Sequence, residues 1–286
     1  MKNIDSICLI VDGWGGLAAF KSILNGDIPK IELITNDLEL ISLSQNNNRI
    51  ILKDINEIES KLIVCAGYKK IISKELLKSK EFINIHYSLL PKYRGFHSTV
   101  WAILNEEAEL GLSIHRMNEF IDDGPIIEQY KVSNDGKSTS NFYMSHFNNW
   151  IENNLNTIIH NYFHGEIIEK EQDKSRATWV GKRNVEDCKL NFNDTNRYLN
   201  NMFRALVDPY PLPFIRMRKS KEEFRITKFE LIQRTINTHI GRILNIDNEG
   251  LYVCTKEGYI ILKELIDVNN NVVMFNHFKI GQYLEL

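Results

Sequence analysis

Residues 82–125 read FINIHYSLLPKYRGFHSTVWAILNEEAELGLSIHRMNEFIDDGP, and polar, titratable side chains stand at the ends of its apolar runs. The first run ends in Asn84-Ile85-His86, and the stretch closes on Asp122-Asp123-Gly124-Pro125. Open α/β sheets place reactive groups at strand ends, so we expect a site here. Asn84 and His86 are two residues apart on one extended segment and therefore face the same side.

The sequence before this stretch alternates short apolar runs with helix-like segments. Strands are expected at Ser6–Val11, Ile31–Thr35, Leu62–Ala66 and Phe82–Ile85. This alternation predicts an α/β fold with a Rossmann-like, mostly parallel sheet. Residues 12–16 (DGWGG) are expected to form a glycine turn before the first helix, but they match neither GxGxxG nor a P-loop.

The last third of the chain has a different pattern. A long helix is expected from Ser138 to about Gly165, followed by a polar linker near Gln172–Ser175. From Phe214 onward, short strand-like runs recur between turn signals such as Asp247–Gly250, as in a small antiparallel sheet or barrel. We therefore expect a catalytic domain at residues 1–175 and a smaller β-rich C-terminal domain at 176–286.

Composition restricts the class of protein. The 286 residues are 43% hydrophobic and 25% charged, which is typical of a soluble enzyme, and the net charge of −2 does not favour nucleic acid as a partner. The four cysteines have no metal-ligand spacing, so no metal is expected. No apolar stretch approaches the roughly 18 to 20 residues that span a bilayer, so no membrane association is expected. The N-terminus has the pattern of a first strand and not of a signal peptide, which predicts a cytoplasmic protein.

Asn84, His86 and Asp122 form the candidate catalytic set. An aspartate beside the histidine would orient the imidazole and raise its basicity, and the asparagine amide could donate to a developing oxyanion. No serine or cysteine stands in a nucleophile elbow, so the set suits transfer to a nucleophile that the substrate brings, such as an amine. By residue type alone, a structural histidine explains the pattern equally well.

NIHYSLLPKYRG, followed by IHRMNEFIDDGPII, resembles the signature of the 10-formyltetrahydrofolate-dependent formyltransferases. The resemblance assigns catalysis to Asn84, His86 and Asp122, with Asp123 at a variable position. It implies N10-formyltetrahydrofolate as the formyl donor. CAGYKKIIS at residues 65–73 resembles the loop that lines the pterin pocket. The folate contacts that the resemblance implies are Lys70, Ile72, Leu90, Met117 and Ile121.

Within this superfamily, IHYSLLPKYRGFHSTVWAI and NEFIDDGPII are similar to the sugar N-formyltransferases that act on nucleotide-linked amino sugars. The resemblance implies substrate contacts from Gly13, Trp14, Tyr87, Ser88, Arg94, His97, Lys182, Arg183 and Tyr210. Leu212 stands where the family has a glycine, so the sequence departs from the family pattern close to Tyr210. Packing or local hydrogen bonding competes closely with these roles at Trp14 and His97, and His115 is interpreted as structural.

The implied acceptor is a dTDP-linked dideoxy amino sugar. The preferred one is dTDP-4-amino-4,6-dideoxyglucose, with the 3-amino-3,6-dideoxy isomer as runner-up, and the product would serve lipopolysaccharide O-antigen or another surface polysaccharide. The rivals are a methionyl-tRNA formyltransferase, a catalytically silent binding module and, more weakly, a dehydrogenase. The β-rich C-terminal region is a candidate homodimer interface.

Overall fold

The computed structural model describes residues 4–47 and 49–286, which form two compact units. Three segments, ending at Ala102, Ser133 and Gly181, build the first unit. The second unit contains Lys182–Leu286 and two short segments from the first half of the chain, Ile103–Glu107 and Asn134–Asn141. The domain boundary expected at residues 175 and 176 stays a prediction.

A seven-stranded sheet forms the centre of the first unit, in the order β3-β2-β1-β4-β5-β7-β8. Strands β1 to β5 pair in parallel, whereas β7 pairs antiparallel with both β5 and β8. The strands are β1 (Ser6–Val11), β2 (Lys30–Ile34), β3 (Ile50–Ile51), β4 (Leu62–Ala66), β5 (Glu81–His86), β7 (Glu109–Arg116) and β8 (Ile126–Ser133). The predicted α/β class with a mostly parallel sheet is confirmed.

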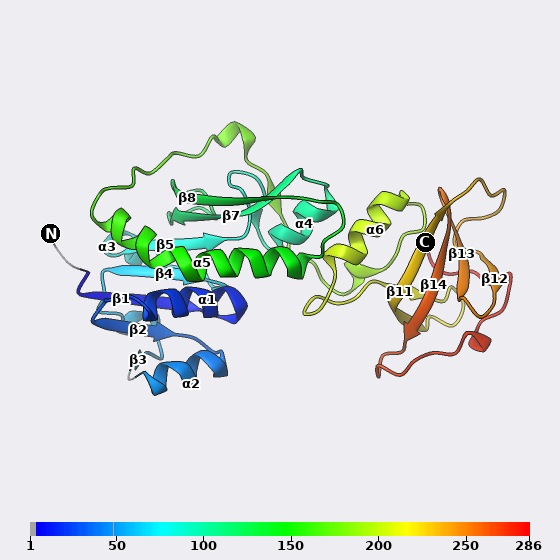
Figure 1. Cartoon of the computed structure of the whole chain (residues 1–286), viewed down its shortest axis with the longest axis horizontal. Helices are drawn as coiled ribbons and strands as arrows, with labels where there is room; N and C mark the ends of the chain where they lie inside the picture. The colour runs from blue at the N-terminus through cyan, green and yellow to red at the C-terminus, as the bar shows by residue number, and fades with distance from the viewer. Residues whose placement is uncertain (1–3, 48) are drawn as a thin grey trace. The chain divides into compact units, whose positions relative to one another are not determined.

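The helices that lie wholly or mostly in this unit are α1 (Gly13–Leu24), α2 (Leu38–Asn46), α3 (Lys74–Ser79), α4 (Ser98–Leu104) and α5 (Ser140–Phe163). Figure 1 shows α1 and α5 on one side of the sheet, and they touch where the Asn156 amide donates to Ser22 Oγ. Residues such as Cys8, Ile10 and Phe82 form an apolar cluster against which Leu76 and Leu77 of α3 pack. Helices thus cover a sheet whose central strands are apolar and buried.

The glycine turn expected at residues 12–16 is wrong in detail, because α1 already begins at Gly13. Two anchors fix its start: the Asp12 amide donates to Ala66 O at the end of β4, and the Gly13 amide donates to Asp37 Oδ2. Gly16 must be small because a Cβ there would lie 2.9 Å from the Val11 side chain. The glycines therefore let α1 start directly at the strand end.

The second unit contains a five-stranded antiparallel sheet in the order β10-β11-β14-β13-β12. Its strands are β10 (Phe214–Arg216), β11 (Glu223–Gln233), β12 (Ile243–Ile246), β13 (Leu251–Thr255) and β14 (Gly258–Ile266). Helix α6 (Asn196–Ala205) begins after Thr195, whose hydroxyl caps it by accepting from the Tyr198 amide. The predicted smaller β-rich domain is confirmed.

The remaining elements are short. Two-residue strands β6 (Arg94–Gly95) and β9 (Trp179–Val180) pair in parallel. Single 3₁₀ turns are η1 (Ile55–Glu57), η2 (Lys174–Arg176), η3 (Glu186–Cys188) and η4 (Phe275–His277). Across residues 4–47 and 49–286, no helix is both long and apolar enough to cross a membrane.

Candidate active site

The end of β5 and the adjacent strand β7 supply three polar side chains to one place. Asn84 and His86 come from β5, as their spacing predicts. The antiparallel register sets Asn84 opposite His115 and His86 opposite Ser113. Asn84 Nδ2 lies 3.2 Å from His115 Nε2. A second buried histidine therefore faces the site across the strand pair.

Asp122 reaches these residues from the loop between β7 and β8. Its backbone has φ of 51°, a left-handed conformation that few non-glycine residues adopt. Gly124 then passes so close to β7 that a Cβ there would lie 1.8 Å from Arg116 O. The Arg116 amide donates to Pro125 O at 2.9 Å and closes the loop. The DDGP segment therefore holds Asp122 in a conformation that turns its carboxylate inward.

The Asp122 carboxylate contacts every other polar group of the site described so far. Its Oδ2 accepts from the Gly95 amide at 2.8 Å and lies 3.5 Å from His86 Nδ1. Its Oδ1 lies 3.3 Å from Asn84 Nδ2 and 3.5 Å from His115 Nε2. One carboxylate thus touches both histidines and the asparagine.

The tautomer of His86 follows from its other contact. His86 Nε2 lies 2.8 Å from Tyr93 O, and a carbonyl oxygen can only accept, so Nε2 carries the proton. Neutral His86 therefore directs the unprotonated Nδ1 toward Asp122. Tyr93 is held in place by its left-handed φ of 58° and by its amide, which donates to Thr178 Oγ1 at 2.8 Å.

Burial and charge set the protonation states. Desolvation lowers the pKa of His86 below its ordinary value, although the Asp122 carboxylate opposes that shift. Desolvation opposes ionisation of Asp122, but the nearby histidines and the Gly95 amide outweigh it and lower its pKa to about 2. Near neutral pH the site therefore holds a neutral imidazole beside an ionised carboxylate. The gap between Nδ1 and Oδ2 is a place where a proton can be taken up.

Asn84 is arranged differently from the expectation. Its Nδ2 group lies within hydrogen-bond distance of both His115 and Asp122, so its N–H groups are directed at protein partners. Donation to an oxyanion would require one of these hydrogen bonds to be released. In this conformation Asn84 positions Asp122 and His115, and its oxyanion role stays a prediction.

His115, which was interpreted from the sequence as structural, lies beside Asp122 and Asn84. It is 1% exposed, its Nδ1 donates to Arg116 O at 3.0 Å, and its Nε2 lies 3.2 Å from Asn84 Nδ2 and 3.5 Å from Asp122 Oδ1. A purely parallel sheet does not bring it near His86, whereas the antiparallel β5–β7 pair does. The signal available in the sequence was the two-residue alternation that puts Ser113 and His115 on one face.

Comparison with known proteins shows the family of this chain. Residues 18–155 match the formyl transferase family, and residues 182–281 match its C-terminal domain. The chain belongs to the formyl transferases. A methionyl-tRNA formyltransferase of Campylobacter jejuni is 29% identical over 246 residues, which is 86% of this chain and 75% of that protein.

Two solved structures share the fold of this formyl transferase. An N-formyltransferase from Helicobacter canadensis, in complex with folinic acid and dTDP-3-aminofucose, has a TM-score of 0.71 at 20% identity and covers 91% of this chain and 99% of its own. A 4-N formyltransferase from Francisella tularensis has a TM-score of 0.65 at 19% identity and covers 78% of this chain and 96% of its own.

Several residues expected to contact substrate lie together in the first unit of this formyl transferase. Gly13 and Trp14 begin α1, and the Trp14 side chain is 49% exposed. Tyr87 follows β5, and its hydroxyl lies so close to Gly15 that a Cβ there would be 2.0 Å away. His97 has a left-handed φ of 56° just before α4. Glycine at position 15 therefore lets Tyr87 reach the start of α1.

Arg94 and Ser88 have internal partners instead. Arg94 is 3% exposed, and its guanidinium donates to Asp123 Oδ1 at 2.6 Å and to Gln172 Oε1 at 2.7 Å. The Ser88 hydroxyl donates to Lys92 O within the SLLPK loop. Because both groups are buried and already hydrogen-bonded within the protein, the geometry favours a structural role for both over the expected substrate contact.

The expected folate contacts divide between core and surface. Ile72 is buried in the apolar cluster that includes Cys65 and Phe82, and Met117 packs against the same cluster. Leu90 is 3% exposed, whereas Ile121 is 60% exposed and Lys70 is also exposed. A salt bridge joins Lys74, at the start of α3 just after Ile72, to Glu119, which lies between Met117 and Ile121.

Lys182, Arg183 and Tyr210 belong to the second unit. Lys182 is exposed, but Arg183 is 9% exposed and its guanidinium donates to Asp187 O. Burial raises the pKa of Tyr210. The Arg183 guanidinium therefore already has a hydrogen-bond partner within its own unit. The binding of a diphosphate by Lys182 and Arg183 stays a prediction, and Lys182 is the exposed member of the pair. Among the described residues, no group of three or more histidine, cysteine or acidic side chains could hold a metal ion.

Proposed function

We propose that this formyl transferase moves the formyl group of N10-formyltetrahydrofolate to the amine of a dTDP-linked dideoxy amino sugar. The observation that carries the chemistry is the 3.5 Å gap between unprotonated His86 Nδ1 and Asp122 Oδ2. An amine that attacks a formyl carbon must lose a proton, and this gap offers a base beside a carboxylate.

Each group has a defined part in the transfer. His86 Nδ1 takes the proton from the attacking amine, which gives an imidazolium held between Tyr93 O and the Asp122 carboxylate. The same proton then returns to the nitrogen that leaves the formyl carbon, so the site ends unchanged. Asp122 stays ionised throughout and stabilises the charged imidazole. His115 and Asn84 hold that carboxylate in position.

The donor supplies the formyl carbon, and the surface beside Asp122 suits the faces of its planar ring. Ile71 is 91% exposed, Phe120 62% and Ile121 60%, next to the buried Ile72. The Lys74–Glu119 salt bridge brings the loops of these residues together. Exposed apolar side chains at a polar site are expected where a ligand covers them. The folinic acid bound to the Helicobacter canadensis neighbour supports the same donor.

The acceptor is the finer part of the proposal. The solved neighbours include one protein with dTDP-3-aminofucose and one called a 4-N formyltransferase. Trp14 is exposed and offers an aromatic surface for a sugar or base. It stands between Gly13 and Gly15, and Gly15 lies against the Tyr87 hydroxyl. We favour dTDP-4-amino-4,6-dideoxyglucose, followed by the dTDP-linked 3-amino-3,6-dideoxyhexoses, in O-antigen or surface polysaccharide synthesis.

A second candidate is formylation of methionyl-tRNA. The observation that favours it is the relative of that name, which aligns with 86% of this chain. Against it stands the net charge of −2, because a tRNA-binding surface relies on cationic side chains to neutralise phosphates.

One experiment separates the two candidates. The protein is incubated with N10-formyltetrahydrofolate and, in parallel, with dTDP- and UDP-linked 3- and 4-amino sugars or with initiator methionyl-tRNA. Mass spectrometry then reports which acceptor gains one formyl group. A gain on a dTDP-sugar supports the proposal, whereas a gain on methionyl-tRNA alone overturns it.

A further inference from the structure

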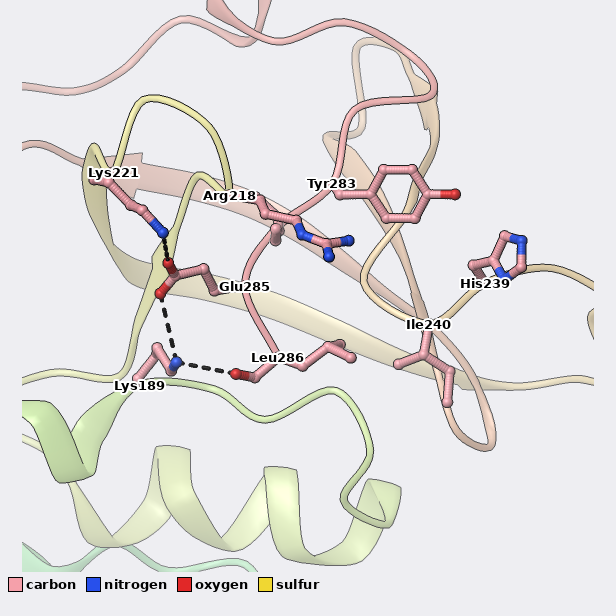
Figure 2. A pocket seen from close by; sticks show the side chains of 9 residues that line it. Lys189, Arg218, Lys221, His239, Ile240, Tyr283, Glu285 and Leu286 are labelled. Atoms are coloured by element: carbon pink, nitrogen blue, oxygen red, sulfur yellow. Dashed lines mark hydrogen bonds and ion pairs between the residues drawn. The ribbon is translucent and has the colours of Figure 1, made fainter.

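The second unit contains a cavity that the proposed reaction does not use. Its volume is about 730 Å³, within the range of roughly 300–1,000 Å³ usual for small-molecule sites. Figure 2 shows the charged and aromatic side chains that surround it. The lining residues are Lys189, Arg218, Lys221, His239, Ile240, Tyr283, Leu284, Glu285 and Leu286.

Main-chain hydrogen bonds fix the walls of this cavity. The Arg218 amide donates to Tyr283 O at 3.1 Å, and the Glu285 amide donates to Arg216 O at 2.9 Å. On the other side, the Leu284 amide donates to Gly241 O at 2.9 Å. The final segment of the chain is therefore held between the turn after β10 and the start of β12. A cavity with hydrogen-bonded walls is a better ligand site than a gap between mobile loops.

The Glu285 carboxylate in the cavity already forms ion pairs within the protein. Glu285 pairs with Lys221 and with Lys189, as the dashed lines in Figure 2 show, and also with Arg216. These cations, with Lys221 as the largest contributor, lower the pKa of Glu285 to about 2, so its charge is permanent and already compensated. Glu285 has no negative charge left to offset the other cations of the cavity.

Arg218 is the remaining arginine of the lining, and Arg242, which does not line the cavity, lies beside the same Tyr283 ring. Their guanidinium carbons lie 6.0 Å and 5.9 Å from the centre of the Tyr283 ring. Within residues 4–47 and 49–286, neither forms an ion pair with a carboxylate. The His239 ring is 6.3 Å from the same tyrosine ring. Two uncompensated guanidinium groups thus stand around an aromatic pair at a cavity, in a protein whose net charge is negative.

We infer that this cavity binds a nucleoside diphosphate, with its phosphates at Arg218 and Arg242 and its base against Tyr283 and His239. Guanidinium groups bind phosphate oxygens through paired N–H donors, and aromatic rings stack on planar bases. A cavity of this volume holds one nucleotide, which favours a mononucleotide over an RNA strand. The inference concerns the second unit alone and does not depend on the acceptor proposed above.

Hydrogen–deuterium exchange on the full chain tests this site locally, whatever binds in the first unit. The probes are dTDP, inorganic pyrophosphate, thymidine and a short RNA hairpin. The variants are the double change Arg218→Gln with Arg242→Gln, Tyr283→Leu, and the matched control Lys219→Gln, an exposed neighbour outside the cavity lining.

We expect dTDP to slow exchange in residues 216–221 and 282–285 of the wild type and of the Lys219→Gln control. The double variant should bind about tenfold or more weakly, because charge-assisted hydrogen bonds are lost, and its formyl transfer rate should stay unchanged. The site is overturned if dTDP at millimolar concentration slows neither segment, or slows both equally in the double variant. Pyrophosphate binding as tightly as dTDP, or protection by RNA alone, contradicts a nucleotide ligand.

Discussion

At the scale of single residues, the contact between His86 Nε2 and Tyr93 O decides what the site can do. That carbonyl leaves Nδ1 unprotonated on the side of Asp122, which is why we propose Nδ1 as the base. The expectation from sequence was an aspartate that orients the imidazole and raises its basicity. The structure presents the carboxylate and the imidazole nitrogen as two acceptors that face a shared proton position.

This arrangement predicts the pH dependence of kcat/KM. The neutral form of His86 is the active one, and its pKa lies below the ordinary 6.5. Activity should therefore fall only as the pH drops through that lowered value, with a plateau above it. Asp122 has a pKa of about 2 and stays ionised over the whole measured range. Formyl transfer measured from pH 4.5 to 9, corrected for titration of the acceptor amine, checks this.

Replacing the Asp122 carboxylate should shift the acid limb of this pH profile, which is the pH range in which kcat/KM falls. Asp122 raises the pKa of His86 against the effect of desolvation. In Asp122→Asn the limb should therefore move to lower pH while the plateau drops by about 10² or more. An acid limb at the same pH in both proteins would mean that another group controls it.

His115 should act through Asp122 and Asn84. In His115→Leu both partners lose a buried polar contact, so we expect a fall of about tenfold or more in kcat with little change in KM. His115→Gln keeps an acceptor for Asn84 and should recover part of the rate. The exposed His146 on α5, changed to Gln, is the control. Equal rates in the Leu and Gln variants would contradict a positioning role.

At the scale of elements, the loop from β7 to β8 is the part that the site depends on most. Gly124→Ala would bring a Cβ to within 1.8 Å of Arg116 O, so the loop and Asp122 must move. We expect a loss of about 1–3 kcal/mol in the free energy of unfolding and a large loss of kcat. Urea unfolding and turnover measure both.

The control for this change is Gly181→Ala. A Cβ at Gly181 meets nothing within 4 Å, and its backbone is not left-handed. Both its unfolding midpoint and its turnover should match those of the wild type. A Gly124→Ala protein that equals this control would show that the loop has room to adapt.

Much of the arrangement of helices and strands was predictable from the sequence. Period-two and buried apolar runs located β1, β4 and β5, and the three residues predicted to be catalytic, Asn84, His86 and Asp122, do lie together. The antiparallel placement of β7 was not predictable, because strand order depends on packing between distant segments. For the same reason the burial of Arg94 against Asp123 and Gln172, 29 and 78 residues away in sequence, could not be anticipated.

At the scale of the whole molecule, the net charge bears on which acceptor the protein binds. The net charge is −2, and phosphate-tracking proteins lose affinity steeply with salt. We expect no gel shift of initiator tRNA by this protein near physiological ionic strength, with a methionyl-tRNA formyltransferase as the positive control. Tight, salt-sensitive binding would instead support the tRNA candidate.

The most direct test of the account is single-turnover formyl transfer by wild type and by His86→Ala. With N10-formyltetrahydrofolate and dTDP-4-amino-4,6-dideoxyglucose, or its 3-amino counterpart, the wild type should transfer one formyl group. The variant should fold normally by circular dichroism and react about 10² to 10⁴ times more slowly. A folded His86→Ala protein that retains most of the wild-type rate would contradict the assignment of His86 as the base.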